Sequence, residues 1–107
     1  MTTANDHEPD TQGGAAHGQA LEAEAAVRAA RQLGLWAAGL MGLASPHLED
    51  YAEAVVRYAG AHADDEAILR KIAQDLTGAG LKFNEDQVRG KHGECMAIAR
   101  GQVQAQG

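Results

Sequence analysis

Apolar residues recur at steps of three and four from residue 20 onward, which is the pattern of an amphipathic helix. The first apolar stripe consists of Ala26, Ala29, Ala30, Leu33, Trp36, Ala37 and Leu40. Gly42 and the Ser45-Pro46 pair interrupt this stripe. The pattern therefore predicts a first helix over residues 20–42.

Ser45 followed by Pro46 is also a start signal, because it offers a hydroxyl cap and then proline at the first helical position. The stripe that follows consists of Leu48, Tyr51, Ala52, Val55 and Ala59. Gly60 comes directly after this stripe. These features predict a second helix over residues 46–59.

A third helix is predicted over residues 65–77. The acidic cluster Asp64, Asp65 and Glu66 suits a helix N-terminus, where carboxylates meet the positive end of the helix dipole. Ile68, Leu69, Ile72 and Leu76 form its apolar stripe, and the segment "TGAG" closes it with two glycines.

The fourth predicted helix covers residues 85–100. Asn84 followed by Gln87 is a weak capping box, and Val88, His92, Cys95, Ile98, Ala99 and Val103 form the last stripe. Gly90, Gly93 and Gly101 each cost about 1 kcal/mol relative to alanine inside a helix. We therefore expect this helix to fray beyond about Arg100.

The predicted elements define an all-α fold. The alternation that marks a half-buried strand occurs over no useful length, and short connections favour antiparallel neighbouring helices. Residues 20–104 are thus predicted to form a small four-helix bundle. Residues 1–19 contain Pro9, the Gly13-Gly14 pair and no lysine or arginine, so we expect a flexible, disordered and acidic N-terminal tail before the bundle.

Composition predicts a single domain with a thin core. The chain has 107 residues, of which 45% are apolar, but 23 of these are alanine. Leu, Ile, Val and Phe make up 18 residues, about 17% of the chain, which is below the level of roughly 20% where disorder becomes a concern. None of the 18 lies in residues 1–19, so the rest of the chain retains enough apolar side chains for a helical core.

The net charge of −6 argues against nucleic acid as a partner, because phosphate binding requires a basic face. The run from Leu33 to Ala44 has 12 residues, against about 20 needed to span a bilayer, so no membrane insertion is expected. The single cysteine fits a reducing compartment, and the N-terminus has no secretory signal. These features favour the cytoplasm.

Candidate catalytic or metal-binding groups are sparse. His92 and Cys95 are spaced to share a helical face, but two ligands are too few for zinc, and a Cys-His nucleophile needs a third, orienting group. The phosphate-loop pattern is absent as well. We therefore expect no catalytic residue, metal or cofactor, and a protein that works by binding.

Two features of the first helix have both a structural and a functional interpretation. Trp36 is the only tryptophan, and its place on the apolar stripe favours a core role over an exposed hot spot for a partner. Arg28 and Arg31 precede the apolar run, and Glu24 is spaced to pair with Arg28. These three charges form either a solvated face or part of a docking surface.

The order of several motifs resembles a known family. These motifs are "LGLWAAGLMGL" (33–43), "YAEAVV" (51–56), "DEAILRKIAQDL" (65–76), "AG" (79–80) and "QVRGK" (87–91). Over roughly residues 24–100, the chain resembles the zeta-subunit family of alphaproteobacterial F-type ATP synthase inhibitors.

The resemblance implies a four-helix bundle with a mobile N-terminal segment. In the family, this segment enters the alpha/beta interface of the soluble catalytic head and blocks ATP hydrolysis. It also implies the alpha, beta and gamma subunits of the head as partners. The protein would be a monomer when free, and peripheral to the inner membrane when bound.

The N-terminal segment departs from the family pattern. Family inhibitory segments carry a charged motif that includes phenylalanine, whereas residues 1–23 contain no phenylalanine, arginine or lysine. Arg28 and Arg31 match family positions. Together with Glu24, which is spaced to pair with Arg28, they are the candidate partner-binding residues. Two hypotheses stay open: a synthase regulator, with its inhibition retained, weakened or lost, and a non-inhibitory zeta-like bundle repurposed to bind another protein or a small ligand.

Overall fold

The computed structural model describes residues 3–62 and 64–106, and the side chains within residues 18–62 and 64–106. These residues form four α-helices: α1 (Thr3–Leu40), α2 (His47–Ala61), α3 (Asp65–Gly78) and α4 (Glu85–Gln106). The described part of the chain contains no strand. The predicted all-α class with four helices is confirmed.

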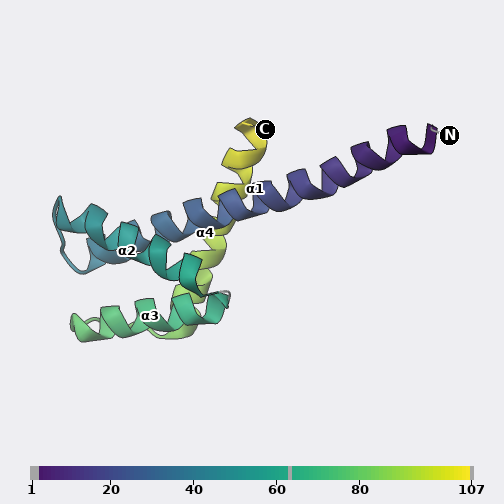
Figure 1. The fold of residues 1–107 in the computed structure, drawn as a ribbon. Coiled ribbons are helices and arrows are strands. Elements are labelled where there is room, and N and C mark those ends of the chain that lie inside the picture. Colours follow the sequence, from purple (N-terminus) through teal and green to yellow (C-terminus); the bar gives the residue numbers. More distant parts are fainter. Residues whose placement is uncertain (1–2, 63, 107) are drawn as a thin grey trace.

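The helices are arranged around α1 (Figure 1). α2 folds back along the C-terminal half of α1, α4 crosses α1 near its middle, and α3 packs against α4 and α2. The N-terminal turns of α1 extend well beyond the other three helices (Figure 1). The molecule is accordingly elongated, with principal extents of 65 × 25 × 21 Å.

The core is small and built largely from aliphatic side chains of all four helices. The largest fully buried side chains are Leu33, Val55, Leu69, Ile72, Leu76 and Val88. Alanines of α1 fill much of the rest, and Ala29 and Ala37 are completely buried. Small residues let the helices approach closely, so a chain with few large apolar residues still closes a core.

α1 and α2 approach each other most closely at Gly34. A Cβ atom added at Gly34 would lie 2.8 Å from the Cα atom of Ala52 and 3.2 Å from the side chain of Val55. Only glycine fits this separation without a shift of one helix. The glycine inside the apolar run of α1 therefore has a packing role.

Two of the three helix N-terminal caps that the sequence predicts are present in the structure. The Asp64 carboxylate accepts a hydrogen bond from the Glu66 amide at 3.0 Å. Asn84 and Gln87 form a reciprocal capping box, with both N–H···O distances at 2.9 Å. These bonds satisfy amides that have no partner within the helix.

The predicted cap at Ser45 is wrong. Pro46 occupies the N-cap position of α2 and has no side-chain cap. The Ser45 hydroxyl instead bonds to the Glu49 carboxylate at 2.7 Å, so it is not available to a backbone amide.

Two helix boundaries, the start of α1 and the end of α4, differ from the prediction by more than two residues. α1 begins at Thr3, not near residue 20. The apolar periodicity marks only the part of a helix that packs against others, and α1 is already helical on the N-terminal side of that part. α4 continues to Gln106 because Val103, only 2% exposed, is buried against the core. The division into a flexible tail (1–19) and a packed domain (20–104) stays a prediction, and the side chains of residues 1–17 lie outside the described residues.

Candidate partner-binding surface

The three candidate residues Glu24, Arg28 and Arg31 lie on one stripe of α1. Their spacing of four and three residues places them one above another on the same helical face. This stripe is opposite the buried face that contains Leu33 and Ala37. The structure therefore brings all three predicted residues together on the outside of the molecule.

Each of the three charges has a partner within the chain. Arg28 pairs with Glu24 at 2.8 Å, with side chains 29% and 49% exposed. Arg28 also donates a hydrogen bond to the Gln106 side chain of α4. Arg31 pairs with Glu53 of α2, and both of these side chains are close to half exposed.

These pairs leave the surface able to exchange partners. Exposed ion pairs contribute about 0–1 kcal/mol because water and salt screen them. A carboxylate on another protein can therefore replace Glu24 or Glu53 as the partner of an arginine at a small cost in free energy. A basic group on another protein can likewise replace an arginine. Both arginines also present planar guanidinium groups suited to carboxylate recognition.

Sequence reasoning missed Glu53 and Gln106, the partners that α2 and α4 contribute. They lie 22 and 78 residues away from the arginines that they contact. Spacing along a single helix reveals pairs such as Glu24–Arg28, but it holds no signal for contacts between helices.

Trp36 lies at the edge of the core, which supports its structural interpretation. It is half-buried and packs against the main apolar cluster. Its ring meets Phe83 edge-to-face at a centroid distance of 5.6 Å. The Lys91 ammonium lies 5.9 Å from the Trp36 ring centroid, within range of a weak cation–π contact.

Cys95 is unsuited to nucleophilic chemistry. Its side chain is buried, and burial raises the pKa of the thiol, an effect that nearby Lys91 partly opposes. A raised pKa leaves little thiolate at neutral pH. Among the side chains that the structure describes, no group of three or more His, Cys, Asp or Glu residues is arranged to hold a metal ion.

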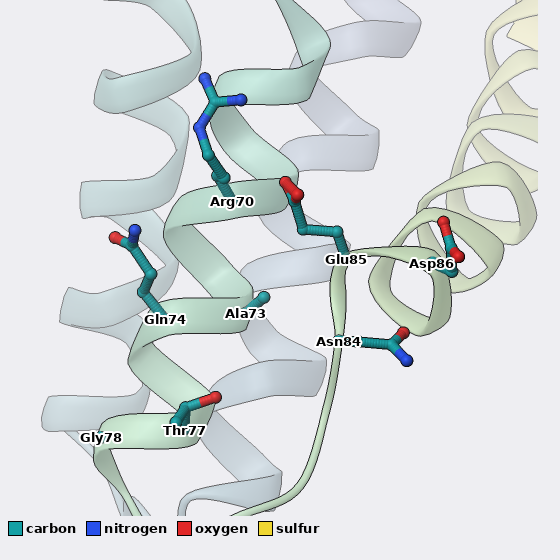
Figure 2. Close-up of a pocket in the computed structure, with 8 residues that line it drawn as sticks. All are labelled: Arg70, Ala73, Gln74, Thr77, Gly78, Asn84, Glu85 and Asp86. Carbon is teal, nitrogen blue, oxygen red and sulfur yellow. The ribbon is translucent and has the colours of Figure 1, made fainter.

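Two cavities lie away from the α1 stripe. One, of about 760 Å³, is bounded by the outer face of α3 and the start of α4. In Figure 2, Arg70, Gln74 and Thr77 follow one side of α3, and Asn84, Glu85 and Asp86 lie opposite. Its lining mixes one arginine with two acidic residues and shows no single ligand chemistry.

The second cavity, of about 560 Å³, lies where all four helices meet. Ala26 of α1, Ala59 at the end of α2 and Ile68 of α3 contribute its apolar lining. His62 and His92 add polar groups, and His62 is stacked on Tyr58 with ring centroids 3.9 Å apart.

No helix within the described residues has the length and apolar character needed to cross a membrane.

The fold is that of a small all-α protein, and Glu24, Arg28 and Arg31 form a charged stripe on the outside of α1. A sequence model of the family described as ATPase inhibitor subunit zeta matches residues 1–102, so the chain belongs to the ATPase inhibitor subunit zeta family. It is accordingly a regulatory protein and not an enzyme. Searches among curated proteins and among solved structures found no match.

Proposed function

We propose that the chain regulates the F-type ATP synthase by binding its soluble catalytic head and inhibiting ATP hydrolysis through the N-terminal segment. The observation that supports this most strongly is the family match, which covers the N-terminal segment as well as the bundle. The alpha, beta and gamma subunits of the head are the proposed partners. The protein would act in the cytoplasm, at the inner membrane surface when bound.

The mechanism requires no catalytic residue. A segment that binds only one conformation of the head shifts the head toward that conformation and stops its cycle. The N-terminal part of α1 suits this role because it projects from the bundle as the free end of a long helix (Figure 1). The bundle is wider than one helix, so it limits how far the segment can enter.

The stripe of Glu24, Arg28 and Arg31 is proposed as the second contact with the head. It lies on the same helix as the projecting segment, where α1 enters the bundle. A head that receives the segment therefore meets this stripe next. Arg31 then exchanges Glu53 for a group of the head.

The test combines binding to the isolated head with ATP hydrolysis. The double charge reversal Arg28→Glu with Arg31→Glu should weaken inhibition by about tenfold, because two favourable pairs become repulsive. Arg70→Glu, an exposed reversal on α3, is the matched control and should leave inhibition unchanged. If the unaltered chain neither binds the head nor slows hydrolysis, the proposed function is wrong.

A second candidate function is a zeta-like bundle that binds another protein or a small ligand without inhibiting. The absence of phenylalanine, arginine and lysine from residues 1–23 favours it. The same titration separates the two functions. Capture of synthase subunits by the immobilised chain, together with slower hydrolysis, would eliminate the second candidate.

A further inference from the structure

We propose that the C-terminal turns of α4, residues 100–106, form a clamp that holds residues 18–28 of α1 and so sets the direction of the N-terminal arm (residues 3–17). The effect of the clamp on inhibition rests on the proposed function. The clamp itself is a property of the free protein.

The ionic part of the clamp is the contact between Arg100 of α4 and Glu22 of α1. The Arg100 Nη2 atom lies 2.7 Å from Glu22 Oε2, and its Nε atom lies 3.2 Å from each carboxylate oxygen. The hydrogen bond from Arg100 lowers the pKa of the Glu22 carboxyl. A guanidinium that meets a carboxylate through two nitrogens fixes orientation as well as distance.

Apolar and polar contacts extend the clamp on both sides of this pair. Leu21 is half-buried against the core, and Val103 is almost fully buried. Both line a cavity of about 150 Å³ with Gly18 and Gln104. Farther along, Arg28 donates a hydrogen bond to the Gln106 side chain, so the contact spans more than one turn of each helix.

The side-chain hydrogen bonds that residues 18–28 make to other helices, among the described residues, all go to α4. On the side that faces the end of α2, Glu22 and Ala26 border the 560 Å³ cavity shared with Ala59 and His62. The packing there is open. The arm continues α1 toward the N-terminus and projects away from the bundle (Figure 1), and Gly18, the first residue after the arm, lines the 150 Å³ cavity together with residues of α4. The α1–α4 contact is therefore placed to set the direction of the arm.

This role makes Glu22 and Arg100 positioning residues. If the Glu22–Arg100 pair is lost, the C-terminal turns of α4 hold α1 less firmly, and the arm samples more directions while the rest of the core stays packed. A partner then selects from a broader ensemble, which weakens its binding.

Charge reversal and charge exchange in the full chain test the clamp. Amide hydrogen exchange of residues 18–28 is compared in the unaltered chain, Arg100→Glu, Glu22→Arg and the double exchange. Arg100→Glu should speed exchange by roughly threefold to tenfold, in line with the loss of an exposed ion pair and its replacement by repulsion. The double exchange should restore protection to within about twofold.

Arg89→Glu is the matched control, because Arg89 also lies on α4 but pairs with Glu66 of α3 and with Asp86, away from α1. Arg89→Glu should leave the amide hydrogen exchange of residues 18–28 unchanged. In Arg100→Glu, the amide hydrogen exchange of residues 66–76 of α3 should be unchanged. The clamp is refuted if Arg100→Glu does not alter residues 18–28, or if the double exchange fails to restore them.

Inhibition of ATP hydrolysis provides the second readout. The positioning role predicts that potency falls in Arg100→Glu and returns in the double exchange. Unchanged potency despite lost protection, or restored protection without restored potency, would refute it. If the unaltered chain does not inhibit at all, the proposed function fails, and hydrogen exchange still decides whether the clamp exists.

Discussion

Gly34 shows how a single residue fixes the separation of two helices in this protein. The chain has few large apolar residues, so its core depends on close approach of α1 and α2, and Gly34 lies at the closest point. Glycine is unfavourable in a helix interior, yet here no larger residue fits. The glycines of α4 differ, because Gly90 has no atom near the position of an added Cβ.

Opposite effects are therefore expected from two identical substitutions. Gly34→Ala should lower the free energy of unfolding by about 1–3 kcal/mol, because the new methyl group overlaps Ala52. Gly90→Ala should raise it by about 0.5–1 kcal/mol through helix propensity alone. Urea unfolding followed by circular dichroism measures both. Equal effects of the two substitutions would refute the close contact between α1 and α2.

Tyr51 gives the protein an alkaline limit to its stability. Burial, and then the hydrogen bond that its hydroxyl donates to Asp75 at 2.6 Å, raise the pKa of the phenol. In the unfolded chain tyrosine ionises near pH 10. Above that pH the unfolded state holds fewer protons than the folded state, so the stability contributed by Tyr51 is present below about pH 10 and falls as the pH rises.

Above about pH 10, the free energy of unfolding should fall with pH by less than about 1.4 kcal/mol per pH unit on account of Tyr51. Tyr51→Phe should remove this part of the alkaline loss of stability. Tyr58→Phe, which leaves the Tyr51–Asp75 bond in place, is the control for any loss that arises from other groups. Unfolding free energies measured between pH 8 and 11 decide the matter, and identical slopes in Tyr51→Phe and the unaltered chain would contradict the assignment.

At the scale of elements, the outcome of each prediction depends on the range of the interaction behind it. The capping box of Asn84 and Gln87 and the Glu24–Arg28 pair form within one turn, so sequence spacing revealed them. The Glu22–Arg100 and Arg31–Glu53 contacts join separate helices, and spacing carries no signal for them. The C-terminal end of α4 differs from the prediction for the same reason, because packing of Val103 in the core extends the helix to Gln106.

Val103 tests whether packing sustains the last turns of α4. Val103→Ala should lower the free energy of unfolding by about 1–3 kcal/mol, because its side chain is buried between the helices. Ile98→Ala on the same helix should change it by less than about 1 kcal/mol, because Ile98 is 54% exposed. Thermal unfolding of both variants provides the comparison. A milder effect at Val103 than at Ile98 would show that α4 does not pack as described.

For the whole molecule, the arrangement separates two tasks. The bundle supplies the body of the molecule, and the N-terminal part of α1 extends well beyond it (Figure 1). The candidate stripe of Glu24, Arg28 and Arg31 and the α4 clamp both lie where the body and the extension meet. The family resemblance predicted a bundle with an N-terminal segment. The contacts that α2 and α4 make with α1 near the start of the bundle could be identified only from the structure.

The most direct test of this account is ATP hydrolysis by the isolated soluble head of the synthase, titrated with the full chain and with a chain that lacks residues 1–17. The shortened chain retains every residue of the clamp and every core residue among those described, and circular dichroism is used to check that it folds. The account predicts inhibition by the full chain and none by the shortened chain. Equal inhibition by both chains, or inhibition by neither, would contradict it.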